Sequence, residues 1–133
     1  MIGLLIISHC ELGKELLNAA ELIFGRLEAT KSIAITQTTE SEELLKMIGE
    51  EIKALDSGRG VLLLTDMFGG TPSNLSLSFL KEEMVEVLTG VNLPMVVEAA
   101  QNRERLSLNE LGEKAQEAGT SGIALAGKLL KSE

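Results

Sequence analysis

Three short apolar runs, spaced about 29 residues apart, constrain the fold of this chain more than any other feature of its sequence. They are Leu4–Ile7, Ile33–Ile35 and Val61–Leu64. This spacing is the length of one strand–helix unit, so the runs are predicted to be parallel strands. They are almost continuously apolar, as is typical of strands that helices cover on both faces. The pattern therefore predicts an α/β fold.

The segments between these runs have the periodicity of amphipathic helices, with one apolar face ending at Gly25 and another at Gly58. Thr39 and Glu42 have the spacing of a capping box before the second of these helices. The rest of the chain predicts a helix over Thr71–Leu80, a strand over Met84–Leu88, a helix from Asn92 to about Asn102, and a helix capped by Ser107 and Glu110 that ends near Gly119.

The segment Gly122–Ala126 is ambiguous, because small residues carry little periodicity, and it fits either a fifth strand or the start of a short helix. We expect one domain over residues 1–133, a doubly wound three-layer α/β sandwich. Its mostly parallel sheet has the predicted order 2-1-3-4, with a possible C-terminal antiparallel strand.

Composition excludes several classes of protein. The net charge of -8 and the absence of a basic stripe argue against nucleic-acid binding. No apolar run is long enough to span a bilayer, and the apolar start is expected to be a core strand rather than a signal peptide. The single cysteine, Cys10, cannot form an internal disulfide, so a cytoplasmic protein is expected.

Candidate functional residues follow the ends of the predicted strands. In open α/β sheets, ligands bind beyond the carboxyl ends of the strands, where the strand order reverses. His9, the only histidine, follows the first strand, and Asp66 follows the third. In a sheet of order 2-1-3-4 these strands are neighbours, so the two side chains are expected to approach each other.

Such a pair is suited to nucleophilic transfer through imidazole. A carboxylate that accepts the Nδ1 proton fixes the tautomer and leaves the Nε2 lone pair free to attack phosphorus. Asp66 would then orient His9 rather than act as a base. Donors for phosphoryl oxygens are predicted in the glycine-rich start of the next helix, at Gly69, Gly70, Thr71, Ser73 and Asn74.

Three segments together resemble the mannose-family IIA component of the phosphoenolpyruvate-dependent sugar phosphotransferase system. They are Ser8–His9, Leu64–Asn74 and Gly90–Met95, and the resemblance covers nearly the whole chain. It implies that the phosphocarrier HPr phosphorylates His9 on Nε2 and that His9 passes the group to a IIB component, which serves membrane IIC and IID components. It further implies that Asp66 bonds to the ring, that Thr71 contacts the phosphoryl group, and that no cofactor is needed.

The resemblance also implies a homodimer that exchanges a C-terminal antiparallel strand. Met67 and Phe68 are expected to dock partner proteins. One departure from the family is Cys10, where glycine is typical, and it puts a positive φ at that position in doubt. His9 and Cys10 do not predict a metal site, because adjacent residues do not converge on one ion.

Two alternatives remain open at this stage. The chain could be a regulatory phosphoprotein whose phosphorylation state another protein reads, because the same site would serve both roles. It could also be the related phosphotransfer subunit that feeds dihydroxyacetone kinase, although Gly69–Asn74 favours the sugar system. The sequence does not encode the identity of the sugar.

Overall fold

The computed structural model describes residues 1–67 and 71–131, which form strands and helices in strict alternation up to the last two helices. In chain order the elements are β1 Gly3–His9, α1 Leu12–Phe24, β2 Thr30–Ile35, α2 Ser41–Leu55, β3 Val61–Thr65, α3 Thr71–Leu77, β4 Val85–Thr89, α4 Leu93–Asn102, α5 Leu108–Ser121 and α6 Ala126–Lys131.

The four strands form one parallel sheet in the order β2-β1-β3-β4, as predicted. The two central strands, β1 and β3, are buried along almost their whole length, which explains why their sequences are continuously apolar. Register pairs His9 with Ile35 of β2 and Ile7 with Thr65 of β3. The carboxyl ends of β1, β2 and β3 therefore lie together at one edge of the sheet.

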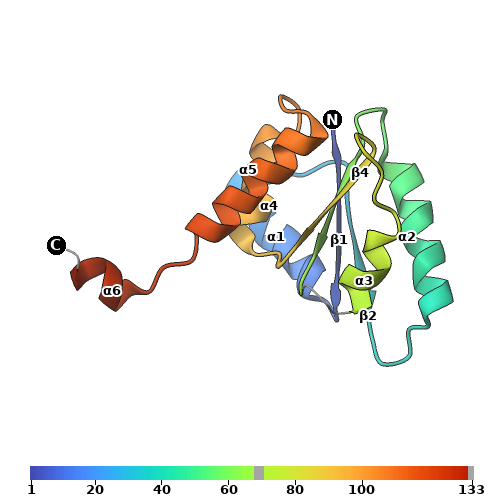
Figure 1. Cartoon of the computed structure of the whole chain (residues 1–133), viewed down its shortest axis with the longest axis horizontal. Helices are drawn as coiled ribbons and strands as arrows, with labels where there is room; N and C mark the ends of the chain where they lie inside the picture. The colour runs from blue at the N-terminus through green and yellow to red at the C-terminus, as the bar shows by residue number, and fades with distance from the viewer. Residues whose placement is uncertain (68–70, 132–133) are drawn as a thin grey trace.

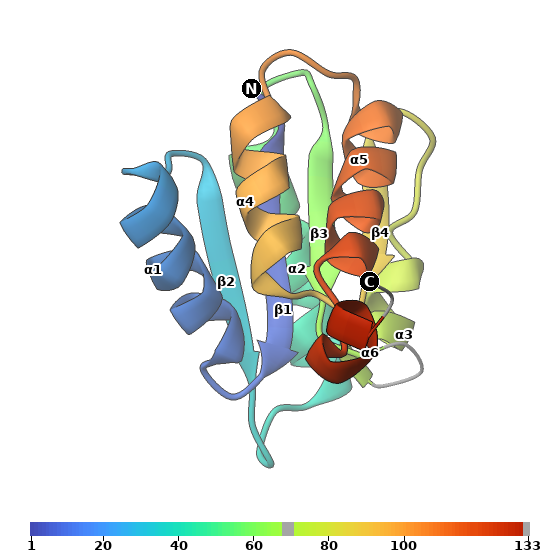
Figure 2. The same cartoon turned by 90° about the vertical axis from the view of Figure 1, so that its left-hand side faces the viewer.

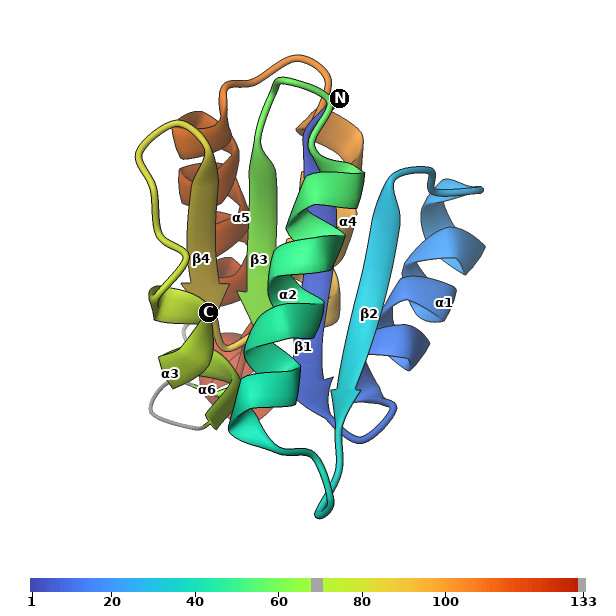
Figure 3. The same cartoon turned by 90° about the vertical axis from the view of Figure 1, so that its right-hand side faces the viewer.

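Helices cover both faces of this sheet and create two cores. Helices α1, α4 and α5 lie on one face, and α2 and α3 lie on the other (Figures 2 and 3). Alternate residues of β1 face opposite cores, so Leu4 and Ile6 pack toward the first group of helices, whereas Leu5 and Ile7 pack toward the second. This arrangement is the predicted three-layer sandwich.

The two predicted capping boxes have different outcomes. Ser107 and Glu110 form the predicted reciprocal pair at the start of α5. The prediction for Thr39 and Glu42 is wrong, because the N-cap of α2 is Glu40, which makes no side-chain cap bond. The Thr39 hydroxyl instead accepts a hydrogen bond from the Thr36 backbone N–H at 3.0 Å. Thr39 therefore bonds within the loop after β2 and does not cap the helix.

The C-terminal segment forms no strand in the described chain. Residues 122–125 are irregular, and α6 follows them away from the rest of the molecule (Figure 1). Four large apolar side chains of this segment are exposed by 62–76%: Ile123, Leu125, Leu129 and Leu130. The possible antiparallel strand is therefore absent from the described residues. Within residues 1–67 and 71–131, no helix is long and apolar enough to cross a membrane.

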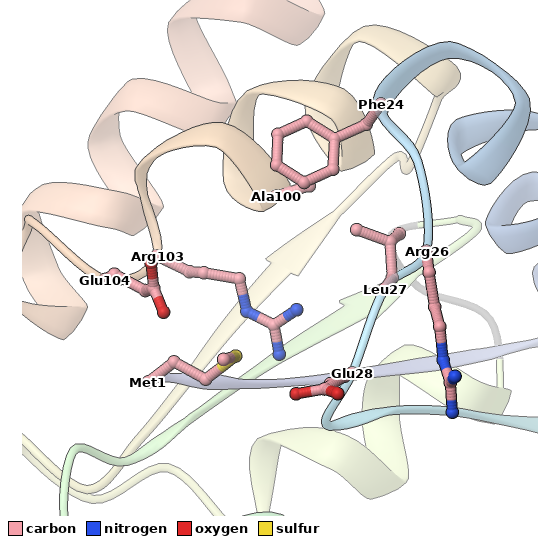
Figure 4. Close-up of a pocket in the computed structure, with 8 residues that line it drawn as sticks. All are labelled: Met1, Phe24, Arg26, Leu27, Glu28, Ala100, Arg103 and Glu104. Carbon is pink, nitrogen blue, oxygen red and sulfur yellow. The ribbon is translucent and has the colours of Figure 1, made fainter.

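At the opposite edge of the sheet, where the strands begin, a buried arginine links two segments of backbone by hydrogen bonds. Arg103 is only 3% exposed, and its Nε and Nη2 donate hydrogen bonds to the carbonyls of Ile2 and Ala29 at 3.0 and 2.8 Å. Burial lowers the pKa of its guanidinium, although Glu104 and Glu28 oppose that shift. The guanidinium lies beside a hollow of about 240 Å³, and Figure 4 shows the side chains that line it. This hollow lies at the edge remote from His9.

Candidate functional site

His9 is the last residue of β1, and Asp66 directly follows β3, so the sheet itself brings them together. Asp66 Oδ2 accepts the His9 backbone N–H at 2.8 Å and lies 2.9 Å from the ring Nδ1. The side chain of His9 is 52% exposed, whereas that of Asp66 is 7% exposed. The predicted approach of these two residues is confirmed. Asp66 contacts the Nδ1 side of the ring, and about half of the His9 side chain remains exposed to solvent.

The charge of Asp66 decides which ring nitrogen carries the proton. Burial raises the pKa of its carboxyl, but hydrogen bonds from the His9 backbone and ring, together with the charge of His9, outweigh burial and lower the pKa below 3.8. At neutral pH Asp66 is therefore a carboxylate, which can only accept hydrogen bonds. Nδ1 of His9 must be the donor in this contact, so the tautomer that the contact selects carries its free lone pair on Nε2.

The backbone just after His9 adopts a conformation that L-residues rarely take. Cys10 has φ +52°, and its N–H donates to the carbonyl of Ile35 at 2.8 Å. Cys10 stands where the family typically has glycine, yet it keeps the left-handed backbone conformation that glycine favours. A residue with a Cβ adopts this conformation at a cost in free energy. Cys10 itself is exposed.

Ser8 has a structural role that the sequence pattern did not indicate. Its buried hydroxyl accepts the backbone N–H of Gly13 at 2.8 Å and so satisfies one of the free donors at the start of α1. A Cβ at Gly13 would lie 2.8 Å from Ile6 and 3.1 Å from this hydroxyl. This close packing fixes the start of α1 beside the turn that carries His9.

The predicted phosphoryl-binding and docking residues are only partly covered by the structure. Phe68, Gly69 and Gly70 lie outside the described residues, so their predicted roles stay predictions. Thr71 and Ser73 belong to the first turn of α3, and Asn74 is an exposed residue of the same helix. Met67, next to Asp66, is 59% exposed, and its docking role stays a prediction, as do the phosphoryl-binding roles of Thr71, Ser73 and Asn74.

The turn after β4 makes hydrogen bonds that stabilise the fold. The N–H of Val91 donates to the carbonyl of Thr65 at 2.8 Å, which ties this turn to the end of β3. Asn92 caps α4 by accepting the N–H of Met95 at 3.2 Å, and its Nδ2 donates to the carbonyl of Gly119 in α5 at 3.1 Å. The described residues contain no cluster of three or more His, Cys, Asp or Glu side chains that could hold a metal ion.

Comparisons with known proteins show which family this chain resembles. The family model described as the fructose IIA component of the phosphotransferase system matches residues 3–116. The chain is 34% identical over 124 residues to the mannose-specific EIIAB component of Escherichia coli K12, covering 92% of this chain but 38% of that relative. It is 30% identical over 125 residues to a putative phosphotransferase enzyme IIA component, YadI, of the same organism, covering 93% of this chain and 86% of the relative.

A solved structure has the same fold over nearly the whole chain. The phosphotransferase component EIIA of Streptococcus agalactiae superposes with a TM-score of 0.87 at 27% identity, covering 96% of this chain and 99% of that one. The sheet order, the likeness to this solved structure and the family match over residues 3–116 agree with one another. The chain therefore belongs to the family of phosphotransferase-system IIA components of the mannose, fructose and sorbose type.

Proposed function

We propose that this chain is a cytoplasmic histidine phosphocarrier. His9 accepts a phosphoryl group on Nε2 from phosphorylated HPr and passes it to a IIB component, which serves sugar uptake and phosphorylation through membrane IIC and IID components. The single observation that carries this proposal is the contact of 2.9 Å between His9 Nδ1 and Asp66 Oδ2. The comparisons with sugar-system proteins favour this role over a dihydroxyacetone-kinase subunit.

The chemistry follows from the protonation state of the pair. The Nε2 lone pair attacks phosphorus, the N–P bond forms, and the bond between phosphorus and the donor's atom breaks. No proton leaves Nε2, while Nδ1 keeps its proton, so the ring gains positive charge. The Asp66 carboxylate balances that charge without taking the proton. Passing the group to the IIB component reverses these steps and regenerates the neutral ring.

The test is to incubate the chain with phosphorylated HPr and to locate the label. We expect an acid-labile, alkali-stable phosphate on His9, and none in His9→Gln. A stable hydroxyl phosphoester, or no label on the wild-type chain, contradicts the carrier role. Adding purified cognate IIB components then separates transport from regulation, because transfer to a IIB component supports transport, whereas failure with each of them favours the regulatory alternative.

We further propose a homodimer that exchanges a C-terminal antiparallel strand formed by Gly122–Ala126. The order of the sheet leaves β4 as an edge strand, and a groove of about 410 Å³ runs beside it between α3 and α5. Edge strands present unpaired backbone groups that a further strand can satisfy. The apolar side chains of Ile123 and Leu125 in this segment are exposed in the single chain, and burying them against a second chain would stabilise a dimer.

Analytical ultracentrifugation tests the exchange. We expect a wild-type dimer and a monomer for the double variant Ile123→Asp, Leu125→Asp. Leu22→Asp is a suitable control, because Leu22 is an apolar residue of α1 that is 91% exposed. A dimer that survives the double variant, or that Leu22→Asp also dissociates, contradicts the exchange of this segment.

A further inference from the structure

A hollow of about 240 Å³ lies at the edge of the sheet where the strands begin (Figure 4). Phe24 from the end of α1, Leu27 from the loop before β2, and Ala100 from α4 give it an apolar wall. Leu27 and Ala100 are buried, whereas Phe24 is 45% exposed, so a ligand in the hollow would cover apolar surface that water now reaches. The volume lies below the range of about 300–1,000 Å³ that is typical of sites for drug-sized ligands, so the hollow suits a smaller molecule.

Arg103 gives the hollow a fixed positive charge. The hydrogen bonds from its Nε and Nη2 to the carbonyls of Ile2 and Ala29 hold the guanidinium in place. A guanidinium has five N–H donors, and two of them belong to Nη1. Among the described residues Nη1 has no hydrogen-bond acceptor, and it is not one of the buried side-chain atoms that lack a partner, so solvent reaches it. Because Arg103 lines the hollow and is otherwise buried, these free donors are suited to a carboxylate bound there.

Two glutamates give the same hollow negative charge. Glu28 and Glu104 line it, and both residues are exposed. Their charges act on the Arg103 guanidinium, yet neither forms an ion pair within residues 1–67 and 71–131. Arg26 lines the hollow as well, but Figure 4 shows its side chain extending away from that of Arg103. The hollow therefore combines a buried cationic group with carboxylates at its exposed rim that have no partner of opposite charge in the described chain.

We infer that this hollow binds a free amino acid with an apolar side chain. The carboxylate of the ligand accepts hydrogen bonds from Nη1 of Arg103, and its ammonium group lies against the carboxylates of Glu28 and Glu104. Its side chain packs on the apolar wall. The two glutamates would repel a simple anion and Arg103 would repel a simple cation, whereas a zwitterion meets opposite charge at both ends. The hollow is remote from the phosphoryl-transfer site, so this binding is a separate property of the chain.

Isothermal titration calorimetry with L-leucine tests this inference, on the chain without an N-terminal tag because Met1 also lines the hollow. We expect L-leucine to bind and to raise the melting temperature of the protein. Leucinamide lacks the carboxylate, and N-acetyl-L-leucine lacks the ammonium group. Each should bind about 10-fold more weakly or worse, because each leaves a charged group of the hollow without its partner.

A double variant isolates the role of the rim. Glu28→Gln, Glu104→Gln removes both negative charges at exposed residues and leaves the backbone bonds of Arg103 in place. We expect its affinity for L-leucine to fall about 10-fold and its preference for L-leucine over N-acetyl-L-leucine to disappear. The matched control is Glu50→Gln, Glu82→Gln, which changes the net charge equally at two exposed residues that do not line the hollow, and it should lose little.

Three results would overturn the inference. The first is no heat of binding and no change in melting temperature with L-leucine up to about 10 mM. The second is equal binding of leucinamide or N-acetyl-L-leucine, because the hollow then does not recognise both charges. The third is a loss of affinity in the rim variant that is no larger than in the control variant. None of these results depends on labelling of His9, so the carrier role is tested separately.

Discussion

Replacing Cys10 with glycine should stabilise the protein, because the left-handed turn beside His9 is strained for any residue with a Cβ. Cys10 has φ +52°, and such a conformation costs an L-residue about 1–2 kcal/mol. Glycine removes that cost but loses more backbone entropy on folding, about 0.5–1 kcal/mol. The difference predicts a gain of about 0.5–1 kcal/mol in the free energy of unfolding.

This gain translates into a measurable shift in the melting temperature. Unfolding entropy is about 2.1 cal/mol/K per residue, so a chain of 133 residues should melt about 2–4 °C higher. Urea denaturation and thermal melts followed by circular dichroism provide the measurement. Cys10→Ala is the matched control, because it removes the thiol but keeps the Cβ. A glycine variant no more stable than the alanine variant would refute the reasoning.

Three further predictions concern the site and its supports. Asp66→Asn should lower kcat/KM for phosphoryl transfer by about 10²–10⁴-fold with an unchanged circular dichroism spectrum, because an amide can donate to Nδ1 and select the wrong tautomer; an unchanged rate would exclude the orienting role. The same variant should be less stable than wild type at neutral pH. Because the lowered pKa of Asp66 stabilises the fold above pH 3.8, that difference in urea denaturation should shrink as the pH falls below this value; a constant difference contradicts it. Gly119→Ala should lower the free energy of unfolding by about 1–3 kcal/mol, since its Cβ would lie 2.5 Å from the buried Met95, whereas Gly127→Ala, with nothing within 4 Å, should not.

The sequence alone determined the topology and the position of the site. Apolar runs about 29 residues apart specify parallel strands, because each crossover needs the length of one helix. Once the strands are parallel, the residues that follow them meet at one edge, which is how the pairing of His9 with Asp66 could be predicted. The cap of α4 at Asn92 and the capping box of α5 could also be predicted, because each joins residues only three positions apart in the sequence.

Only the tertiary structure decided how these groups are held. Whether Thr39 caps α2 depends on the path of the loop after β2, and the prediction from spacing alone was wrong. The positive φ of Cys10 accompanies a backbone bond to Ile35 of the neighbouring strand, a contact that side-chain patterns do not encode. The lowered pKa of Asp66 likewise arises from hydrogen bonds with a residue 57 positions away. Segment Gly122–Ala126 was ambiguous in the sequence because small residues carry little periodicity, and the structure shows an irregular stretch that leads into α6.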